Sequence, residues 1–414
     1  MPHETRHDRS RARGIARHGR LRKPSGVRTA VLAAAVVAAV AVVSTGSVAA
    51  FAAWDLARTV EANSVDISDG KAPPPSIGAI DGGANVLLVG SDSREGQGDR
   101  YGDPAEMAGI DHNDVTMLLH ISEDHSRATV VSFPRDLLID RPSCRDEDGT
   151  TDIPAVSGQP MNMAMQDGGL ACVVRTVETL TGLDVPYAGV VQFLGVKGVA
   201  RAIGGVPVCL ANPIDDDDAD IHLGAGDQVL QGDDVVGFLR TRHGVSDGSD
   251  VGRIGNQQVF LSALMRAVTS TGTLTNPAAV YGIARAVVEN VALSTSLDDP
   301  STLTSLALTM RDIPLDRITF VQYPHIPAGQ KVAPDTASAD RMMALIASDS
   351  DFALAAGRAA NGVVLPPGAD APPAPSPASD AGAAPTVEPS GPAVLPDNVM
   401  GQTADSETCS NGRR

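Results

Sequence analysis

Five charged side chains stand at the ends of apolar runs in this sequence: Asp92, Arg94, Asp114, Arg135 and Asp136. Aspartates offer the oxygen ligands that Mg²⁺ prefers and shares with substrate phosphates. Arginine guanidinium groups bind phosphate oxygens in pairs through parallel N–H donors. Phosphoryl transfer needs mainly positioning and charge neutralisation, and these two residue types supply both. The combination therefore indicates phosphate chemistry.

A second group of cationic residues lies further along the chain. Arg240 and Arg242 stand in an Arg-Thr-Arg-His sequence, and a loop rich in Gly, Ser and Asp separates them from Arg253. Arg253 and Gln257 are four residues apart, so they share one face near the start of a predicted helix. The free N–H groups and the dipole of a helix N-terminus favour phosphate. An arginine at that position predicts an anion site.

Three predicted strands position the first group. The apolar run in 85–89 has no polar break, which is typical of a strand buried on both faces. Residues 115–121 and 127–133 are separated by a short polar turn and predict an antiparallel hairpin. The start of one hairpin strand then lies beside the end of the other, which brings Asp114 to Arg135. If the first strand runs parallel to 127–133, its charged tip reaches the same sheet edge.

The rest of the domain alternates between helices and strands. Apolar residues at helical spacing predict a helix over 170–180, and Gly182 ends it. The alternation predicts an α/β fold, in which one domain has a central mixed β-sheet flanked by helices. The further predicted elements are strands at 187–193, 206–210 and 318–323 and helices at 194–203 and 253–268.

Charge is distributed unevenly along the 414 residues. The net charge is −18, but residues 1–28 contain nine basic and two acidic side chains, so the remaining residues carry −25. A domain that acidic lacks the broad basic face that nucleic acid requires, which excludes nucleic acid as a general partner. The acidic run 215–218 is interpreted as a solvated loop, because its ligand spacing does not fit an EF-hand calcium site.

Residues 29–54 contain no charged side chain and are rich in Val, Ala and Leu. This length is sufficient for a helix that spans a bilayer, and Trp54 would then lie at the outer interface. The basic residues 1–28 are typical of a cytoplasmic tail. A cleaved signal peptide is the alternative, because Ala-x-Ala sites occur near the end of the run. In both cases the rest of the chain is exported.

Composition divides the chain into six segments. Stretches rich in Pro, Ala, Gly and Ser mark a stalk and a linker. We therefore expect a single-pass cell-membrane protein with a cytoplasmic N-terminus and an extracellular catalytic domain. The predicted segments are a basic tail (1–28), a transmembrane helix (29–54), a stalk (55–82), the catalytic domain (83–350), a Pro/Ala-rich linker (351–395) and a C-terminal tail with Cys409 (396–414).

The four cysteines, Cys144, Cys172, Cys209 and Cys409, do not have the spacing of a zinc site. In an exported protein two disulfides are expected, and four cysteines allow three connectivities. The pairing of Cys144 with Cys172 and of Cys209 with Cys409 is favoured, because the first pair closes the shortest loop. Free buried thiols are the alternative for a cytosolic domain.

Nine short motifs follow one another along the chain, at 85–94, 114–120, 132–136, 162–164, 168–182, 204–210, 230–233, 240–243 and 250–258. In this order they resemble the LytR-CpsA-Psr family, in particular its actinobacterial members. The resemblance covers about residues 83–350. It implies an outer-face, Mg²⁺-dependent phosphotransferase that moves a glycan phosphate from a polyprenyl-pyrophosphate carrier to a peptidoglycan hydroxyl. The expected glycopolymers are teichoic acid or capsule polysaccharide, and pyrophosphatase activity is expected as a side reaction.

The resemblance also implies a role for each matched residue. Asp92 and Asp114 would bind Mg²⁺ on the pyrophosphate, and Asp92 would accept the proton of the muramic acid hydroxyl. Asp136 would orient Arg135, and Gln257 would fix the network that binds substrate. The arginines that would bind the pyrophosphate oxygens are Arg94, Arg135, Arg240, Arg242 and Arg253.

Three positions depart from the family pattern. His112 and Asn113 stand where the family usually has an arginine and a serine, and Asn256 stands where an arginine usually precedes two glutamines. Two arginines that bind pyrophosphate would then be missing. This departure favours an alternative function: a catalytically weak or inactive, membrane-anchored wall-binding or scaffold protein that binds polyprenyl-pyrophosphate carriers.

Overall fold

The chain separates into two units, residues 1–54 and residues 55–414, and every element described here belongs to the second. The predicted transmembrane segment 29–54 and the candidate residues Asp92 and Arg94 lie outside the described residues. Within the described part of the chain, no helix has both the length and the apolar character that crossing a membrane requires. The computed structural model describes residues 58–59, 64–68, 83–91, 112–146, 149–355, 360–366 and 392–413.

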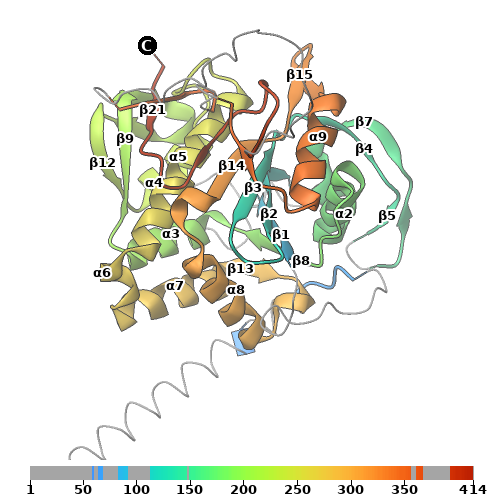
Figure 1. Cartoon of the computed structure of the whole chain (residues 1–414), viewed down its shortest axis with the longest axis horizontal. Helices are drawn as coiled ribbons and strands as arrows, with labels where there is room; N and C mark the ends of the chain where they lie inside the picture. Colours follow the sequence, from blue (N-terminus) through green and yellow to red (C-terminus); the bar gives the residue numbers. More distant parts are fainter. Residues whose placement is uncertain are drawn as a thin grey trace, which may run out of the picture. The chain divides into compact units, whose positions relative to one another are not determined.

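In the described residues, a seven-stranded mixed sheet forms the centre of the domain (Figure 1). Its order is β13-β8-β1-β2-β3-β14-β20. β1 is parallel to β8 and β3 is parallel to β14, whereas the other neighbours are antiparallel. The predicted α/β class with a central mixed sheet is confirmed. The strands are β1 (Ala84–Ser91), β2 (Asn113–Ile121), β3 (Ala128–Phe133), β8 (Tyr187–Val191), β13 (Val291–Leu293), β14 (Ile318–Gln322) and β20 (Gly401–Thr403).

The predicted hairpin lies at the centre of this sheet. β2 is antiparallel to β3, and Thr116 near the start of β2 is opposite Phe133 at the end of β3. β1 is also antiparallel to β2, so it runs in the same direction as β3. Gly90 allows the close pairing near the end of β1, because a Cβ atom there would lie 2.9 Å from the Val115 Cβ. The ends of β1 and β3 therefore share one sheet edge with the start of β2.

Helices cover both faces of the central sheet (Figure 1). One face buries side chains such as Leu118 and Val131, and the other buries side chains such as Phe320. Because successive side chains of a strand point to opposite faces, each apolar strand contributes to both cores. Gly182 ends one of these helices in the left-handed conformation, as the sequence predicted. The helices are α2 (Ala164–Thr181) and α9 (Thr336–Ala347) on the first face and α5 (Asp250–Thr269) and α8 (Pro300–Asp312) on the second.

A second sheet, with the order β12-β9-β21-β18, carries the end of the chain. Two further helices pack with α5 against it. We expected residues 396–414 to form a tail, but they supply both β20 at the edge of the central sheet and β21 inside the second sheet. The elements are β9 (Val206–Asn212), β12 (Gly226–Leu230), β18 (Val363–Val364), β21 (Cys409–Asn411), α3 (Phe193–Ala202) and α4 (Asp233–Arg240).

Short elements connect these layers. α7 packs along α3, and the β15–β16 hairpin reaches the end of the central sheet through a bridge between Leu137 and Val332. The shorter strands are β4 (Leu138–Arg141), β5 (Cys144–Arg145), β6 (Asp152–Ile153), β7 (Val156–Pro160), β10 (Ile214–Asp216), β11 (Ile221–Leu223), β15 (His325–Ala328), β16 (Lys331–Pro334), β17 (Phe352–Ala353) and β19 (Ala393–Val394). The remaining helices are α6 (Thr271–Leu274) and α7 (Pro277–Asn290).

Both disulfides match the favoured pairing. Cys144 is bonded to Cys172, which joins β5 to α2. Cys209 is bonded to Cys409, and these residues are register partners in the parallel strands β9 and β21. The second bond therefore fixes the final strand within the domain.

Candidate active site

Asp114 and Arg135 meet at the sheet edge where the hairpin argument predicted. Nη1 of Arg135 lies 2.5 Å from Oδ1 of Asp114, and both side chains are less than one-fifth exposed. Asp114 is the second residue of β2, and Arg135 follows the end of β3 after Pro134. The predicted proximity of these two residues is confirmed.

Arg253 joins this pair from the first turns of α5. Its Nη2 donates to the backbone carbonyl of Asp114 at 2.7 Å and lies 2.6 Å from Oδ1 of Asp250. Its Nη1 lies 3.7 Å from Oδ2 of Asp114. Ser249 caps the helix by accepting the backbone N–H of Gly252. The N-terminus of α5 is therefore directed at the charged sheet edge.

Asp250 is a site residue that the sequence argument missed. Its Oδ2 accepts the backbone N–H of Arg135 at 3.1 Å, while Oδ1 faces Arg253. Its side chain is 8% exposed, so this carboxylate is a buried bridge between the sheet edge and α5. The sequence does contain a signal for this pair. Asp250 stands three residues before Arg253, the first residue of a predicted helix, and oppositely charged side chains at this spacing are neighbours on a helix surface.

Arg242 belongs to the same electrostatic cluster. Burial lowers the pKa of its guanidinium, and the charges of Arg253 and Arg135 lower it further, whereas Asp114 and Asp250 act in the opposite direction. Such mutual effects require short separations in a partly buried site. We call these five residues the arginine cluster. It contains three guanidinium groups and two carboxylates, so a bound anion would neutralise the excess positive charge.

Two guanidinium groups of the arginine cluster retain hydrogen-bonding capacity. The Nε atoms of Arg135 and Arg253 are buried, and neither has a hydrogen-bond partner among the described residues. Leaving a buried donor unsatisfied costs about 1–3 kcal/mol. Phosphate oxygens are suitable acceptors for such donors. The cluster therefore has both the charge and the free donors of a phosphate site.

Of the other predicted residues, Asp136 borders the arginine cluster and Arg240 lies close to Arg242 in the sequence. Asp136 Oδ1 lies 3.3 Å from Lys331 Nζ, and its Oδ2 lies 3.8 Å from Nε of Arg135. Asp136 is thus shared between the cluster and the β15–β16 hairpin. Arg240 is the last residue of α4, two positions before Arg242, and its side chain is half-buried.

The side chains of Asn256 and Gln257 tie α5 to the end of α4. Gln257 Nε2 donates to the Leu239 carbonyl at 3.2 Å, and Asn256 Nδ2 donates to the Phe238 carbonyl. Asn256 also accepts a hydrogen bond from Ser410 in β21. Asn256 is thus fully buried and connects α5 to α4 and to the final strand.

Asn113 also has a structural position. Its Nδ2 donates to Thr116 Oγ1 at 2.9 Å and to the Met161 carbonyl at 3.1 Å. Its Oδ1 accepts the backbone N–H of Met165 at 3.1 Å. All three contacts are buried: the first lies within β2, and the other two connect β2 to Met161, just before α2, and to the first turn of α2. Asn113 therefore fixes the strand that carries Asp114.

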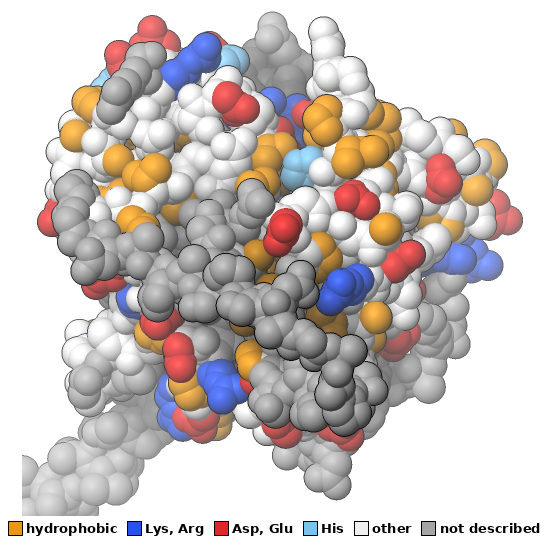
Figure 2. Space-filling view, turned by 45° about the horizontal axis from the view of Figure 1, so that its top comes forward, with side chains coloured by type: hydrophobic (Ala, Val, Ile, Leu, Met, Phe, Trp, Pro, Cys, Tyr) orange, Lys and Arg blue, Asp and Glu red, His pale blue; other side chains and the backbone are white. Residues whose placement is uncertain are grey.

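Acidic, basic and apolar side chains are interspersed on the face that Figure 2 shows, and its described residues form no continuous basic area.

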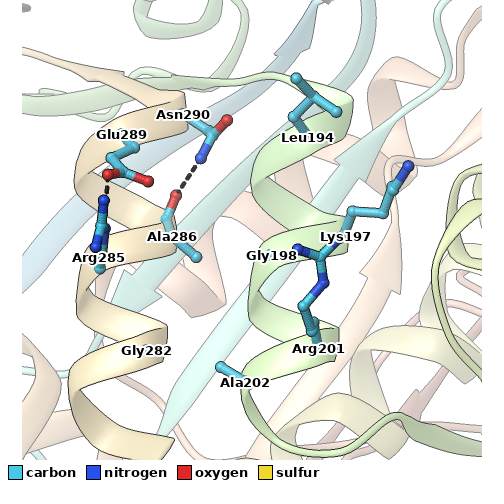
Figure 3. Close-up of a pocket in the computed structure, with 10 residues that line it drawn as sticks. All are labelled: Leu194, Lys197, Gly198, Arg201, Ala202, Gly282, Arg285, Ala286, Glu289 and Asn290. Atoms are coloured by element: carbon cyan, nitrogen blue, oxygen red, sulfur yellow. Dashed lines mark hydrogen bonds and ion pairs between the residues drawn. The ribbon is translucent and has the colours of Figure 1, made fainter.

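A separate cavity of about 390 Å³ lies between α3 and α7 (Figure 3). On its walls, Lys197 is paired with Asp233 at 2.5 Å and Arg285 with Glu289 at 2.7 Å. Its lining residues come from these two helices and include no member of the arginine cluster.

Comparison with known proteins places these features in a family context. A model of the LytR_cpsA_psr family matches residues 41–342 of this chain. The LytR-Csp2A-Psr enzyme from Actinomyces oris has a similar fold, with a TM-score of 0.51 at 20% sequence identity, and the match covers 68% of this chain and 94% of that chain.

Curated relatives extend the comparison. The cell wall biosynthesis protein LcpA of Corynebacterium glutamicum is 32% identical over 276 residues, which cover 59% of this chain and 51% of LcpA. The probable cell wall biosynthesis protein LcpB of the same organism is 30% identical, covering 66% of this chain and 63% of LcpB. The polyisoprenyl-teichoic acid–peptidoglycan teichoic acid transferase TagT of Bacillus subtilis is 24% identical, covering 70% and 84%. This chain spans about half to two-thirds of the length of LcpA and LcpB.

Proposed function

Because the chain belongs to the LytR-CpsA-Psr family, we propose that it transfers a glycopolymer phosphate from a polyprenyl-pyrophosphate carrier to a peptidoglycan hydroxyl. The observation that carries this proposal is the arginine cluster, with its excess positive charge and buried free donors. The names of the relatives support it, since LcpA is a cell wall biosynthesis protein and TagT a teichoic acid transferase.

In the proposed reaction, the acceptor hydroxyl oxygen attacks the phosphorus atom next to the glycan. The bond from that phosphorus to the bridging oxygen breaks, so a phosphodiester forms and polyprenyl phosphate leaves. The hydroxyl proton passes to a carboxylate, for which we propose Asp92. Arg135, Arg242 and Arg253 bind the non-bridging oxygens and stabilise the charge that develops on them.

Asp114 is suited to share a magnesium ion with Asp92. Its Oδ1 is occupied by Arg135, whereas its Oδ2 is 3.7 Å from Arg253 Nη1, which is too long for a normal hydrogen bond. The second oxygen is therefore available to a cation, and the side chain is partly exposed. Carboxylate and phosphate oxygens are the ligands that Mg²⁺ prefers. A bound Mg²⁺ would neutralise part of the pyrophosphate charge.

Apolar side chains of β1 and α5 that are not fully buried are a candidate site for the lipid tail of the carrier. Leu88 is 38% exposed although it lies in β1 at the middle of the central sheet. It is on the same face as Val86, since the two are separated by one residue in a strand. Leu261 and Met265 of α5 are only partly buried on that face. We propose that the polyprenyl chain packs there.

A reconstituted transfer assay tests the proposed function. We expect the full chain in detergent, given a polyprenyl-pyrophosphate glycan, Mg²⁺ and peptidoglycan, to form a glycan–peptidoglycan phosphodiester and release polyprenyl phosphate. EDTA should stop the reaction, and added Mg²⁺ should restore it. Carrier binding without product would support the scaffold alternative. Absence of both binding and product would overturn the proposal.

A further inference from the structure

Asp216 forms an unusually complete set of hydrogen bonds outside the arginine cluster. It ends β10 and is 5% exposed. Its Oδ2 accepts the Thr241 hydroxyl at 2.6 Å and the backbone N–H groups of Arg242 and Gly244, both at 3.2 Å. Its Oδ1 accepts the backbone N–H of Asp218 at 3.1 Å. One buried carboxylate thus holds the segment 241–244 through hydrogen bonds to three of its four residues.

The segment 241–244 leads directly into the arginine cluster. It follows α4 and carries Arg242, whose guanidinium interacts with the charges of Arg135 and Arg253. One of the hydrogen bonds to Asp216 comes from the backbone N–H of Arg242 itself. A displacement of Asp216 would therefore move the backbone from which that guanidinium extends.

The end of this segment and the residues just after it contact residues 411–413 at the end of the described chain. The backbone N–H of Arg413 donates to the Gly244 carbonyl at 2.9 Å, and that of Ser246 donates to the Asn411 carbonyl at 2.9 Å. These contacts bind Gly244 and Ser246, whereas the backbone N–H of Arg242 is bound by Asp216. The two groups of hydrogen bonds therefore hold different residues. Of the two, only the group formed by Asp216 includes the backbone N–H of Arg242.

The neighbouring acidic residues have different surroundings. Asp215 is exposed and pairs with His222, and Asp218 is exposed and pairs with His243. Burial alone would raise the pKa of Asp216, but the hydrogen bonds from Thr241, Gly244 and Arg242 lower it below its usual value. Asp216 is therefore charged at neutral pH, and its neighbours in the acidic run provide matched controls.

We propose that Asp216 is a positioning residue that fixes Arg242 in the geometry that binds the transferred phosphate. The inference rests on the proposed transferase function. It assigns part of the acidic run 215–218, which the sequence indicated only as a solvated loop, to the catalytic site. Misplacement of a binding group by about 1 Å costs on the order of 100-fold in rate, so a backbone shift at Arg242 has a large effect.

The test compares variants of the full chain in the transfer assay. We expect Asp216→Asn to lower kcat about 10- to 100-fold, because the amide offers one acceptor oxygen in place of two. Thr241→Val removes a single hydrogen bond and should lower kcat less. Asp215→Asn should leave the rate within about twofold of the unchanged chain, since its carboxylate contacts His222 on the surface.

A double-mutant cycle separates positioning from loss of stability. If Asp216 acts through Arg242, Asp216→Asn should have less than about a threefold further effect in an Arg242→Ala background. A full independent effect in that background would overturn the proposal. Equal rates for the unchanged chain, Asp216→Asn and Thr241→Val would also overturn it.

Amide hydrogen exchange tests the same contacts without any turnover. The amides of Arg242 and Gly244 should exchange faster in Asp216→Asn than in Asp215→Asn, while the amides of β2 should stay protected. Unchanged exchange at these two amides contradicts the proposal. If exchange changes as expected but the unchanged chain transfers nothing, it is the proposed transferase function that fails.

Discussion

At the residue scale, the arginine cluster is defined by an imbalance of charge in a small, mostly buried volume. Arg135 and Arg253 contact the carboxylates of Asp114 and Asp250, and the charges of both carboxylates also act on Arg242. Buried charges are stable only when they are paired and hydrogen-bonded. In the arginine cluster, carboxylates pair with part of the positive charge, and two buried Nε donors are left for a ligand. Phosphoryl transfer uses such an excess of positive charge to stabilise the phosphate oxygens.

Asp114→Asn tests the centre of the cluster. The amide has nearly the same shape but lacks the charge that pairs with Arg135 and that would bind Mg²⁺. We expect transfer to fall by about 100-fold or more, a typical loss when one charge-stabilising group is removed. Asp227→Asn, on the exposed strand β12, is the control and should match the unchanged chain. A rate for Asp114→Asn within threefold of that control would contradict the assignment.

The acid stability of the chain should depend on Asp216. Its folded pKa is lower than the unfolded value of about 3.9, so the unfolded state binds the proton first as pH falls. Its stabilising contribution is then complete above about pH 4 and is lost as pH falls through the lowered folded pKa. Asp216→Asn should be less stable at pH 7 and lose stability less steeply below pH 4.

Urea unfolding between pH 3 and pH 7 measures this difference. Other carboxylates with lowered pKa values, such as Asp124, contribute equally to both proteins and cancel in the comparison. Parallel stability curves for the two proteins across the acidic range would show that Asp216 does not contribute in this way.

At the element scale, α5 connects the parts of the domain. Ser249 caps its N-terminus, which directs Arg253 at the sheet edge. Further along, Asn256 bonds to both α4 and β21, and buried apolar residues of α5 belong to the core of the second sheet. The final strand β21 completes that sheet and is bonded through Cys409 to Cys209. The site therefore depends on a segment that is far from it in sequence.

The two disulfides should differ in their effect on stability. Cys209–Cys409 joins residues 200 positions apart, whereas Cys144–Cys172 joins residues 28 positions apart. In the chain-entropy model the longer loop stabilises by about 5 kcal/mol and the shorter by about 3.5 kcal/mol. Paired Cys→Ala variants of each bond, compared by urea unfolding, should follow this order. The reverse order would show that native contacts of β21 dominate over chain entropy.

At the scale of the whole molecule, residues 55–414 contain the central sheet, the second sheet and their cores. Outside the basic residues 1–28 the chain carries −25, which favours solubility and opposes binding to nucleic acid. We propose that residues 29–54 anchor this unit in the cell membrane, with residues 1–28 in the cytoplasm and the catalytic unit outside.

A fragment of residues 55–414 tests this division. We expect it to be soluble without detergent, to unfold cooperatively and to retain transfer on carrier dispersed in micelles. The full chain should sediment with membranes and require detergent for extraction. Release of the full chain by high salt alone would contradict a membrane-spanning anchor, because salt weakens surface charge attraction and leaves a spanning helix in place.

Several features of this protein were determined by the sequence itself. The apolar runs and turns predicted the central strands and their hairpin, and that pairing by itself placed Asp114 beside Arg135. The spacing of apolar residues in a strand or a helix reflects which side of that element is buried. A short stretch of sequence is therefore enough to predict the element. The favoured cysteine pairing was confirmed as well.

Only the tertiary structure decided the rest. Asp250 bonds to Arg135, which is 115 positions away, and Asp216 bonds to a segment about 25 positions away. The final residues, which read as a polar tail, contribute strands to two sheets because their backbone groups complete open strand edges. Contacts of this kind depend on which surfaces meet after folding, so neither spacing nor composition contains them. The arginine cluster exists because a sheet edge, a helix N-terminus and the segment 241–244 converge in space.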